Sequence, residues 1–530
     1  MSNFPSRRSV VMGFNGAVAT SQPLAAQAGL RILMQGGNAA DAAVATAAAL
    51  NVVEPMSTGM GGDVFALFYI AAERRVYALN ASGRAPYAAT LEEYARRGLT
   101  EIPRHGILPV TVPGAAAGWA DTISRFGRLR LDTVLKPAIE YAEQGYPVSE
   151  RISYLWTRCE SLLANDAEAT RVFLPGGRAP RAGARVSLPD LAGSLRLLAN
   201  DGPDAFYRGP IARAIVEASR AYDGLLTMQD LADHTSTWVE PIHIDYRGYR
   251  VFECPPNGHG IAALIALNIL SAYDLAGMGF DSTDALHLKM EAMKLAMTDA
   301  SRYVADPELA HVPIEALLSA DYAARRRESI RMDRAIAEPQ PGMLPITPDT
   351  VYLSVVDGEG NAVSFINSLY TSFGSGIVAR GTGIALQNRG NLFVLDPDHP
   401  NCIAPHKRPY HTIIPCMVTR EDRLALCFGV MGGYMQPQGH VQVLTNIIDH
   451  GMNPQQALDA PRFMYQQGRE YIIENSYDAA AYPDLEARGH ILKESESLFF
   501  GGGQVIMVDP ESGALMAGSE PRNDGCAVAY

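Results

Sequence analysis

Thr350 stands where the chain changes character, because it follows a proline-rich stretch and begins a run of alternating β-type residues. A threonine hydroxyl is a weak nucleophile at neutral pH unless a base lies beside it. The α-amine of a newly freed chain end, with a reference pKa of about 7.7 to 8.0, can be that base. The position therefore predicts a nucleophile that becomes active when the bond between Asp349 and Thr350 is cut. The alternative is that Thr350 is simply the first residue of a strand.

Three glycine clusters could supply the backbone N–H groups that acyl transfer requires. Adjacent N–H groups without side chains in the way are well suited to stabilise an oxyanion. Each cluster is equally typical of a tight turn between two elements. The clusters are STGMGGD (57–63), SFGSGIV (372–378) and GVMGGYMQPQGH (429–440).

Other catalytic signatures are missing from the sequence. There is no GxSxG elbow, no HExxH, no phosphate-binding GxxxxGK[ST] and no dinucleotide fingerprint after a strand. The six cysteines form no CxxC pair, so we expect them to be reduced and mostly buried. We predict no cofactor and no metal, and a metallohydrolase is disfavoured because no ligand cluster has workable spacing.

The charge balance restricts the possible partners. A formal net charge of -13 disfavours non-specific binding to nucleic acid or to an anionic membrane surface. Any anionic substrate would need a locally basic pocket. The amino terminus has a small basic cluster but no long apolar segment, and no other apolar run is long enough to span a bilayer. We therefore expect a cytoplasmic protein.

A linker and a hairpin position the candidate nucleophile. Residues 332–349 include four prolines and one glycine in RAIAEPQPGMLPITPD and show no hydrophobic periodicity, which is typical of a flexible linker. TVYLSVVDGEGNAVSFINSLY follows directly and predicts a β-hairpin. The boundary divides the chain into residues 1–349, which include the linker, and residues 350–530.

The other elements suggest stacked sheets with helices outside them. Residues 23–53 predict two Ala-rich helices that are broken at Gly36 and Gly37, with Asn38 as the cap of the second. Three further helices are expected at LDTVLKPAIEYAEQGY, LPDLAGSLRLLAND and DALHLKMEAMKLAMTDASRYV, and a fourth at QPQGHVQVLTNIIDHGM. Strands are expected at DVFALFYI, RVYALN, HTIIPCMVT, RLALCFGV and GQVIMVD.

Ordered motifs along nearly the whole chain resemble the γ-glutamyltranspeptidase family of N-terminal-nucleophile hydrolases. They are GGNAADAAVA, STGMGGD, TVPGAAAGW, PPNGHG, DTVYLSVVDGEGNAV, FGSGIV, KRPYHTIIP, MGGYMQPQGH, NPQQALDAPRF and SEPRNDGCAVAY. The resemblance implies an α+β fold in the form of a four-layer αββα sandwich. It also implies one precursor that cuts itself before a threonine into a large and a small subunit, which stay together as an αβ heterodimer and could pair further.

The resemblance assigns roles around the nucleophile. It implies that Thr350 attacks the substrate and that Gly432 and Gly433 stabilise the oxyanion. Ser368 falls where the family commonly has a second threonine, so a hydroxyl is kept beside the nucleophile.

The residues that would hold a γ-glutamyl group depart from the family pattern. Tyr370 replaces an asparagine, while Arg389 and Leu392 replace a glutamine and an aspartate. A carboxylate at the last position would pair with the α-ammonium of the substrate. Its loss removes a charge-assisted contact of about 1.5 to 3 kcal/mol, which should weaken binding of true γ-glutamyl donors.

Other positions point towards a different acyl group. His411 and Thr412 replace a serine pair, and Arg84 lies two residues beyond the position of a carboxylate-binding arginine of the family. Arginine can grip a carboxylate with two hydrogen bonds, so Arg84 and Arg389 are the candidates for an anionic acyl group, although either could be a solvated surface arginine.

The predicted function is hydrolysis of an amide whose acyl group carries a carboxylate but no amine, favoured over transpeptidation. This pattern is similar to γ-glutamyltransferase-like, glutaryl (cephalosporin) acylase-like and oxamate amidohydrolase-like branches of the family. A standard γ-glutamyltransferase or glutathione hydrolase is the first alternative. A catalytically inactive binding protein is the alternative from another class, which an intact Thr350, Gly432 and Gly433 disfavour.

Overall fold

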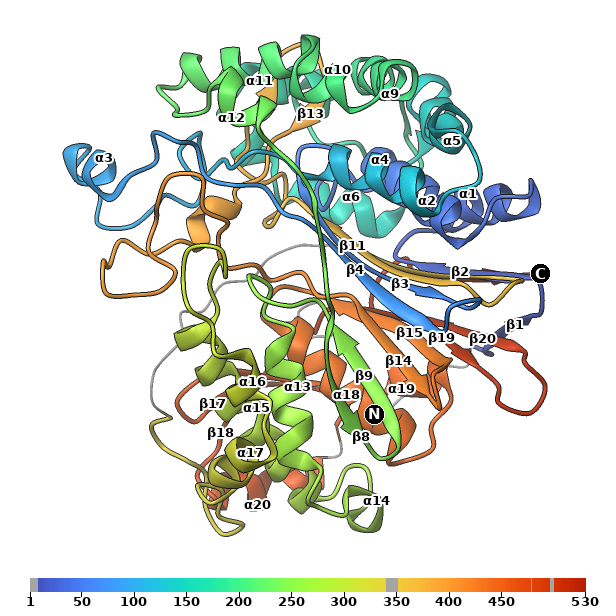
Figure 1. Cartoon of the computed structure of the whole chain (residues 1–530), viewed down its shortest axis with the longest axis vertical. Helices are drawn as coiled ribbons and strands as arrows, with labels where there is room; N and C mark the ends of the chain where they lie inside the picture. The colour runs from blue at the N-terminus through green and yellow to red at the C-terminus, as the bar shows by residue number, and fades with distance from the viewer. Residues whose placement is uncertain (1–7, 340–350, 478, 496–499) are drawn as a thin grey trace.

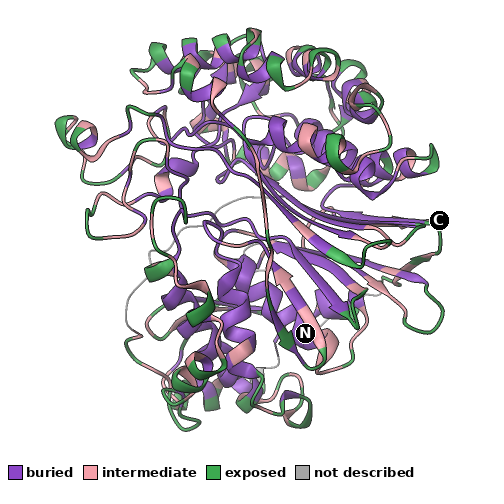
Figure 2. Cartoon of the chain, in the orientation of Figure 1, coloured by how far each residue is buried: buried purple, intermediate pink, exposed green. Residues whose placement is uncertain are grey.

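Two seven-stranded sheets face each other at the centre of the molecule, and helices cover their outer sides (Figure 1). The computed structural model describes residues 8–339, 351–477, 479–495 and 500–530. Apolar side chains such as Phe65, Ile366 and Met417 fill the space between the sheets. The α+β class predicted from the sequence is therefore confirmed. Figure 2 shows that burial is concentrated in the sheets and on the helix faces that touch them.

The first sheet is built around the predicted hairpin, formed by β10 (Val351–Asp357) and β11 (Ala362–Ser368). Every residue of both strands is buried, because helices cover one face of the sheet and the second sheet covers the other. The sheet has the order β21-β2-β10-β11-β3-β4-β7. Its other strands are β2 (Gly16–Thr20), β3 (Asp63–Ile70), β4 (Arg75–Ala81), β7 (Thr237–Val239) and β21 (Cys526–Ala529).

The second sheet has the order β1-β20-β19-β15-β14-β9-β8. The strand predicted over 411–419 begins only at Cys416, so the first half of that prediction is wrong. His411 and Ile414 instead donate their backbone N–H groups to Asn257 and Gln436. The strands are β1 (Val11–Gly13), β8 (Ile242–Tyr246), β9 (Tyr249–Glu253), β14 (Cys416–Arg420), β15 (Arg423–Met431), β19 (Gly502–Val508) and β20 (Leu515–Ser519).

The helices over the first sheet begin with the two predicted Ala-rich segments. Asn38 caps the second of them by accepting from the N–H groups of Ala40 and Asp41, and every residue of that helix is buried. Small side chains allow this close packing between neighbouring helices. They include α1 (Pro23–Met34), α2 (Ala39–Val53), α4 (Ala115–Phe126), α5 (Leu131–Gln144), α6 (Glu150–Thr157), α8 (Ala167–Phe173), α9 (Pro189–Asp201) and α11 (Pro210–Ala221).

A second group of helices packs on the outer face of the second sheet (Figure 1). It includes α13 (Ile261–Leu270), α15 (Thr283–Tyr303), α17 (Ala320–Arg327), α18 (Met435–Ile448) and α19 (Pro454–Asp459). In the described part of the chain, no helix has the length and apolar character needed to cross a membrane.

The start of the predicted linker is anchored to α15. The Lys294 ammonium donates to the carbonyl of Ile336 at 2.7 Å, and the Glu291 carboxylate accepts from the N–H of Ile336 at 2.9 Å. Lys294 and Glu291 also pair with each other at 2.6 Å, and both side chains are fully buried. The linker is therefore held as far as Ile336, and residues 340–350 lie outside the described residues.

Candidate active site

A glycine turn connects the end of β15 to the start of α18. Gly432 has φ of 120° and Gly433 has φ of 56°, which are backbone conformations that favour glycine. A Cβ atom on Gly432 would lie 2.9 Å from the Cα of Gly501. In the ranges that the structure describes, neither glycine N–H has a hydrogen-bond acceptor. Two adjacent donors at a strand-to-helix turn are thus available to a ligand.

The predicted cleavage site, Asp349 and Thr350, lies outside the described residues. The next described residue is Val351, the first residue of β10, which pairs with Asn367 of the neighbouring strand. Ser368 follows Asn367 and ends β11. The Ser368 hydroxyl oxygen accepts from the N–H of Tyr370 at 2.9 Å, so it is held at the edge of the sheet where β10 begins.

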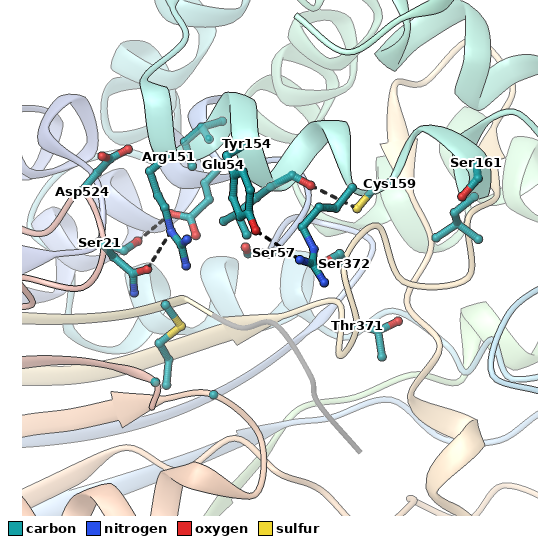
Figure 3. Close-up of a pocket in the computed structure, with 18 of the residues that line it drawn as sticks. Ser21, Glu54, Ser57, Arg151, Tyr154, Cys159, Ser161, Thr371, Ser372 and Asp524 are labelled. Carbon is teal, nitrogen blue, oxygen red and sulfur yellow. Dashed lines mark hydrogen bonds between the residues drawn. The ribbon is translucent and has the colours of Figure 1, made fainter. Parts of the chain in front are cut away.

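A cavity of about 390 Å³ opens at this end of the sheets (Figure 3). Gly432 lines it together with residues of the loops after β2, β11 and β15, and helix α6 forms another wall. Three arginines line it: Arg104, Arg151 and Arg158. Two acidic residues also line the cavity, and both hydrogen-bond to serines: Glu54 accepts from Ser21 and Asp524 from Ser149. Arginines therefore outnumber carboxylates in this lining, three to two.

A buried polar cluster surrounds the guanidinium of Arg389. Its Nη1 donates to the Thr412 hydroxyl at 2.7 Å, and its Nη2 donates to the Ser368 hydroxyl at 3.0 Å. The guanidinium carbon lies 4.6 Å from the ring centroid of Tyr370, a cation–π arrangement. Burial lowers the pKa of Arg389 to about 10, which leaves it charged at neutral pH. This Arg389 cluster unites four of the predicted site residues.

Asp63 and His411 complete the Arg389 cluster. One oxygen of Asp63 accepts from the N–H groups of Gly83 and Gly114 and from the amide of Gln387, and the other lies 3.1 Å from His411 Nε2. Burial alone would raise the pKa of Asp63, but the hydrogen bond from His411 and the charge of Arg389 outweigh it and hold the pKa below its usual value.

His411 is the neutral partner in this pair. Burial and the charge of Arg389 lower its pKa to about 4. Its Nδ1 accepts from the N–H of Ile413 at 3.3 Å, so the proton is on Nε2, which donates to Asp63. We conclude that Asp63 is ionised and His411 neutral at physiological pH.

Arg84 lies in a separate ion pair. Its Nη2 is 2.9 Å from the Glu308 carboxylate, and Arg408 pairs with the same carboxylate at 3.1 Å. Burial would raise the pKa of Glu308, but the two arginines hold it below its usual value. Arg84 therefore shares a carboxylate with Arg408, and the lining of the cavity in the described residues does not include it.

Three candidate functional residues were missed by sequence reasoning. Asp63 ends the glycine motif STGMGGD, where a carboxylate at the first position of a buried strand could have indicated a polar anchor. Arg151 and Arg158 lie seven residues apart in ERISYLWTR, which is one helical face opposite the apolar Ile152 and Trp156. That spacing was a usable signal, but the cavity beside it was not visible in the sequence.

Comparison with known proteins decides the family. The family model described as gamma-glutamyltranspeptidase matches residues 25–530. The chain belongs to the γ-glutamyltranspeptidase family. The resemblance inferred from the motifs is thereby confirmed.

Relatives cover this chain almost from end to end. The glutathione hydrolase-like YwrD proenzyme of Bacillus subtilis (strain 168) is 39% identical over 98% of this chain and 99% of its own. The acylase ACY 1 proenzyme of Pseudomonas sp. (strain SE83) is 36% identical over 100% of this chain and 96% of its own. The crystal structure of cephalosporin acylase from Bacillus halodurans has a TM-score of 0.95 and 47% identity, with 100% and 98% covered.

These members of the γ-glutamyltranspeptidase family are named as hydrolases or acylases, and two of them as proenzymes. The chain is accordingly an enzyme of the N-terminal-nucleophile hydrolase type, and its relatives support an autoprocessed amidohydrolase.

Proposed function

We propose that this protein is an amidohydrolase that cuts itself before Thr350 and then uses Thr350 to cleave an amide whose acyl group carries a carboxylate. The observation that carries the proposal is the pair of available N–H groups at Gly432 and Gly433. Gly432 lines the cavity near the start of β10, and Gly433 is the next residue. A buried arginine cluster lies at the same strand end, around Ser368.

The reaction proceeds in two steps. The Thr350 hydroxyl attacks the amide carbonyl, and its own α-amine takes the hydroxyl proton and passes it to the leaving amine. Gly432 and Gly433 donate to the oxyanion of the tetrahedral intermediate. The amine departs and leaves an ester on Thr350. A water molecule, activated by the same α-amine, then attacks the ester and releases the carboxylic acid.

The polar cluster favours an acyl group without an amine. At the positions where the family binds the amino-acid end of a γ-glutamyl group, this chain has Tyr370, Arg389 and Leu392. None of these side chains is an anion that could form an ion pair with the substrate ammonium. The nearby carboxylate of Asp63 is already saturated by four hydrogen bonds. Glu308 forms a direct ion pair with Arg84, whereas in the described residues no carboxylate lies within ion-pair distance of Arg389, so Arg389 is the favoured candidate for the carboxylate of the acyl group. Hydrolysis rather than transpeptidation is proposed on the same grounds.

The subunit organisation is part of the proposal. Residues 1–349 form the large subunit and residues 350–530 the small subunit of an αβ heterodimer. Strand β10 pairs with β2 and β11, so strands from both sides of the cut share one sheet. The order of layers, helices, sheet, sheet and helices, supports a four-layer αββα core common to both subunits.

The test uses purified wild type, Thr350→Ala and Thr347→Ala, which removes a threonine from the linker three residues earlier. On a denaturing gel we expect two fragments for wild type and Thr347→Ala and one uncut chain for Thr350→Ala. Hydrolysis of glutaryl 4-nitroanilide, γ-glutamyl 4-nitroanilide, glutathione and oxamate is measured with and without glycylglycine as acceptor. An uncut, inactive wild type would refute the nucleophile, and a preference for the γ-glutamyl anilide would refute the substrate argument.

A further inference from the structure

Three side chains from three elements meet where α18 packs on the second sheet. Glu253 ends β9 and Cys416 begins β14, and the two are direct partners on neighbouring strands, so their side chains project from the same face. The His440 ring of α18 lies over that face, 5.0 Å from the ring of Phe428 in β15. Its Nδ1 is 2.7 Å from an oxygen of Glu253. The three residues are at most 2% exposed and lie up to 187 positions apart in the chain.

Carboxylate, thiolate and imidazole are the kinds of protein ligand that zinc binds, at about 2.0 to 2.3 Å. In a tetrahedral shell such bonds place neighbouring ligand atoms about 3.3 to 3.7 Å apart. One donor atom from each of Glu253, Cys416 and His440 lies within 4.8 Å of the other two. Because the carboxylate and the imidazole already approach to 2.7 Å, small shifts of the side chains suffice to enclose one ion.

The charge of Glu253 points to a cation at this position. Among the described residues, no lysine or arginine lies within ion-pair distance of its carboxylate, and His440 is its one partner of that kind. Other buried glutamates have a permanent cation: Glu474 and Glu520 both pair with Arg522. A buried carboxylate is generally paired with a cation or bound to a metal, because a lone charge away from water is costly.

A simple pair of Glu253 and His440 leaves buried polar atoms without a partner. Oε2 of Glu253 and Nε2 of His440 have no hydrogen-bond partner in the part of the chain that the structure describes. Gly260, at the start of α13, makes room for the carboxylate, since a Cβ there would lie 2.8 Å from Oε2. Unpaired polar atoms are uncommon in protein interiors, and coordination to an ion would give these groups a partner. The unpaired atoms and the lack of a permanent cation therefore favour a bound metal over an isolated pair.

We propose that Glu253, Cys416 and His440 bind one structural zinc ion, with a water molecule in the fourth position. The thiol releases its proton to solvent when the ion binds. Burial keeps substrate away from the ion, so it contributes to stability and not to the reaction. Glu253 belongs to residues 1–349, whereas Cys416 and His440 belong to residues 350–530. The ion therefore joins the two subunits, a consequence that rests on the proposed self-cleavage. The proposal replaces the prediction of no metal, which depended on spacing along the chain.

Metal content tests the site directly. Full-length protein without a histidine tag is purified from cells grown with zinc, washed with EDTA to remove surface ions and analysed for bound metal by mass spectrometry. We expect about one zinc ion per chain in wild type and at least about 10-fold less in Cys416→Ala and His440→Gln, because loss of a hydrogen-bond partner of a metal ligand alone costs roughly 10-fold to 100-fold in affinity. Cys254→Ala is the matched control and should keep its zinc, since this buried thiol follows Glu253 but faces the space between the sheets. A zinc-free wild type, or equal zinc in all four proteins, would overturn the proposal.

Cobalt provides a second measurement that needs no variant. Wild type produced in zinc-depleted medium with added cobalt should contain cobalt and show the intense near-ultraviolet absorption of a cobalt–thiolate bond. Bound cobalt without that absorption would exclude Cys416 as a ligand and refute the site.

Separation of the fragments tests the link between the subunits. In size-exclusion chromatography at increasing urea, the two fragments of Cys416→Ala should separate at a lower urea concentration than those of Cys254→Ala, because an ion bound only by the assembled protein stabilises it. Separation at the same concentration would refute the joining role. If wild type contains zinc that Cys416→Ala and His440→Gln lose, but stays a single uncut chain, the proposed function fails and the zinc site stands.

Discussion

Acid should destabilise the protein at a pH well above the range in which carboxylates titrate, because several histidines are buried in their neutral form. His259 is completely buried, with Nδ1 3.0 Å from the Tyr410 hydroxyl and Nε2 2.9 Å from the carbonyl oxygen of Thr412. Nε2 carries the proton because its partner can only accept. A second proton on Nδ1 would face the hydroxyl that donates to it. Burial, above all, lowers the pKa of His259 to about 3.

The magnitude follows from linkage between folding and protonation. In the unfolded chain His259 has its ordinary pKa of 6.5, so below pH 6.5 only the unfolded state gains a proton. The contribution of the neutral His259 to the free energy of unfolding is therefore complete above pH 6.5 and is lost as the pH falls towards 3. Each pH unit in this window costs about 1.4 kcal/mol, so at pH 5 this one residue costs about 2 kcal/mol. His411, whose pKa is lowered to about 4, adds a loss of similar size at pH 5.

Urea unfolding followed by tryptophan fluorescence measures this effect at pH 7.5, 6.5, 5.5 and 5.0. The Thr350→Ala background keeps the chain in one piece if the proposed self-cleavage is correct. His259→Gln cannot take up the proton, so its loss of unfolding free energy between pH 7.5 and 5.0 should be about 2 kcal/mol smaller than that of the parent. The exposed His311→Gln is the control and should match the parent. If His259→Gln and the parent show the same pH dependence, the reasoning about a neutral buried imidazole is wrong.

Three further substitutions test the site and its supports. Gly432→Ala places a Cβ 2.9 Å from the Cα of Gly501 at φ of 120° and should lower kcat roughly 10² to 10³-fold on a chain that still folds, measured by anilide hydrolysis and circular dichroism. Asp63→Asn removes the negative charge that offsets the buried guanidinium of Arg389, so it should lower the free energy of unfolding in urea by roughly 3 to 5 kcal/mol. An unchanged midpoint of urea unfolding would argue against an ionised Asp63. Lys294→Met leaves the buried Glu291 without its cation and should lower the unfolding temperature in thermal scans. The double substitution Lys294→Met with Glu291→Gln leaves no unpaired charge and should lower that temperature less.

Much of the local structure was predictable from the sequence. The caps and breaks of α1 and α2 depend on residues that are neighbours in the chain, such as Asn38 and Asp41. The period of two residues identified the hairpin of β10 and β11, and the change from linker to strand located the candidate nucleophile. The prediction failed at residues 411–415, where apolar residues suggested a strand but side chains and carbonyls from distant segments take the backbone hydrogen bonds.

The charge states and roles of the arginines were decided by tertiary structure alone. Arg84 appeared suitable for a substrate carboxylate, but its partner Glu308 lies 224 positions away in the chain. Arg151 and Arg158 were not predicted as site residues, yet the fold places them on a cavity, where no carboxylate of the described residues forms an ion pair with them. Short-range patterns specify which elements form, because caps and periodicity act between near neighbours. Which charge is neutralised and which remains available for a ligand depends on contacts between residues far apart in sequence, and only the folded chain brings those together.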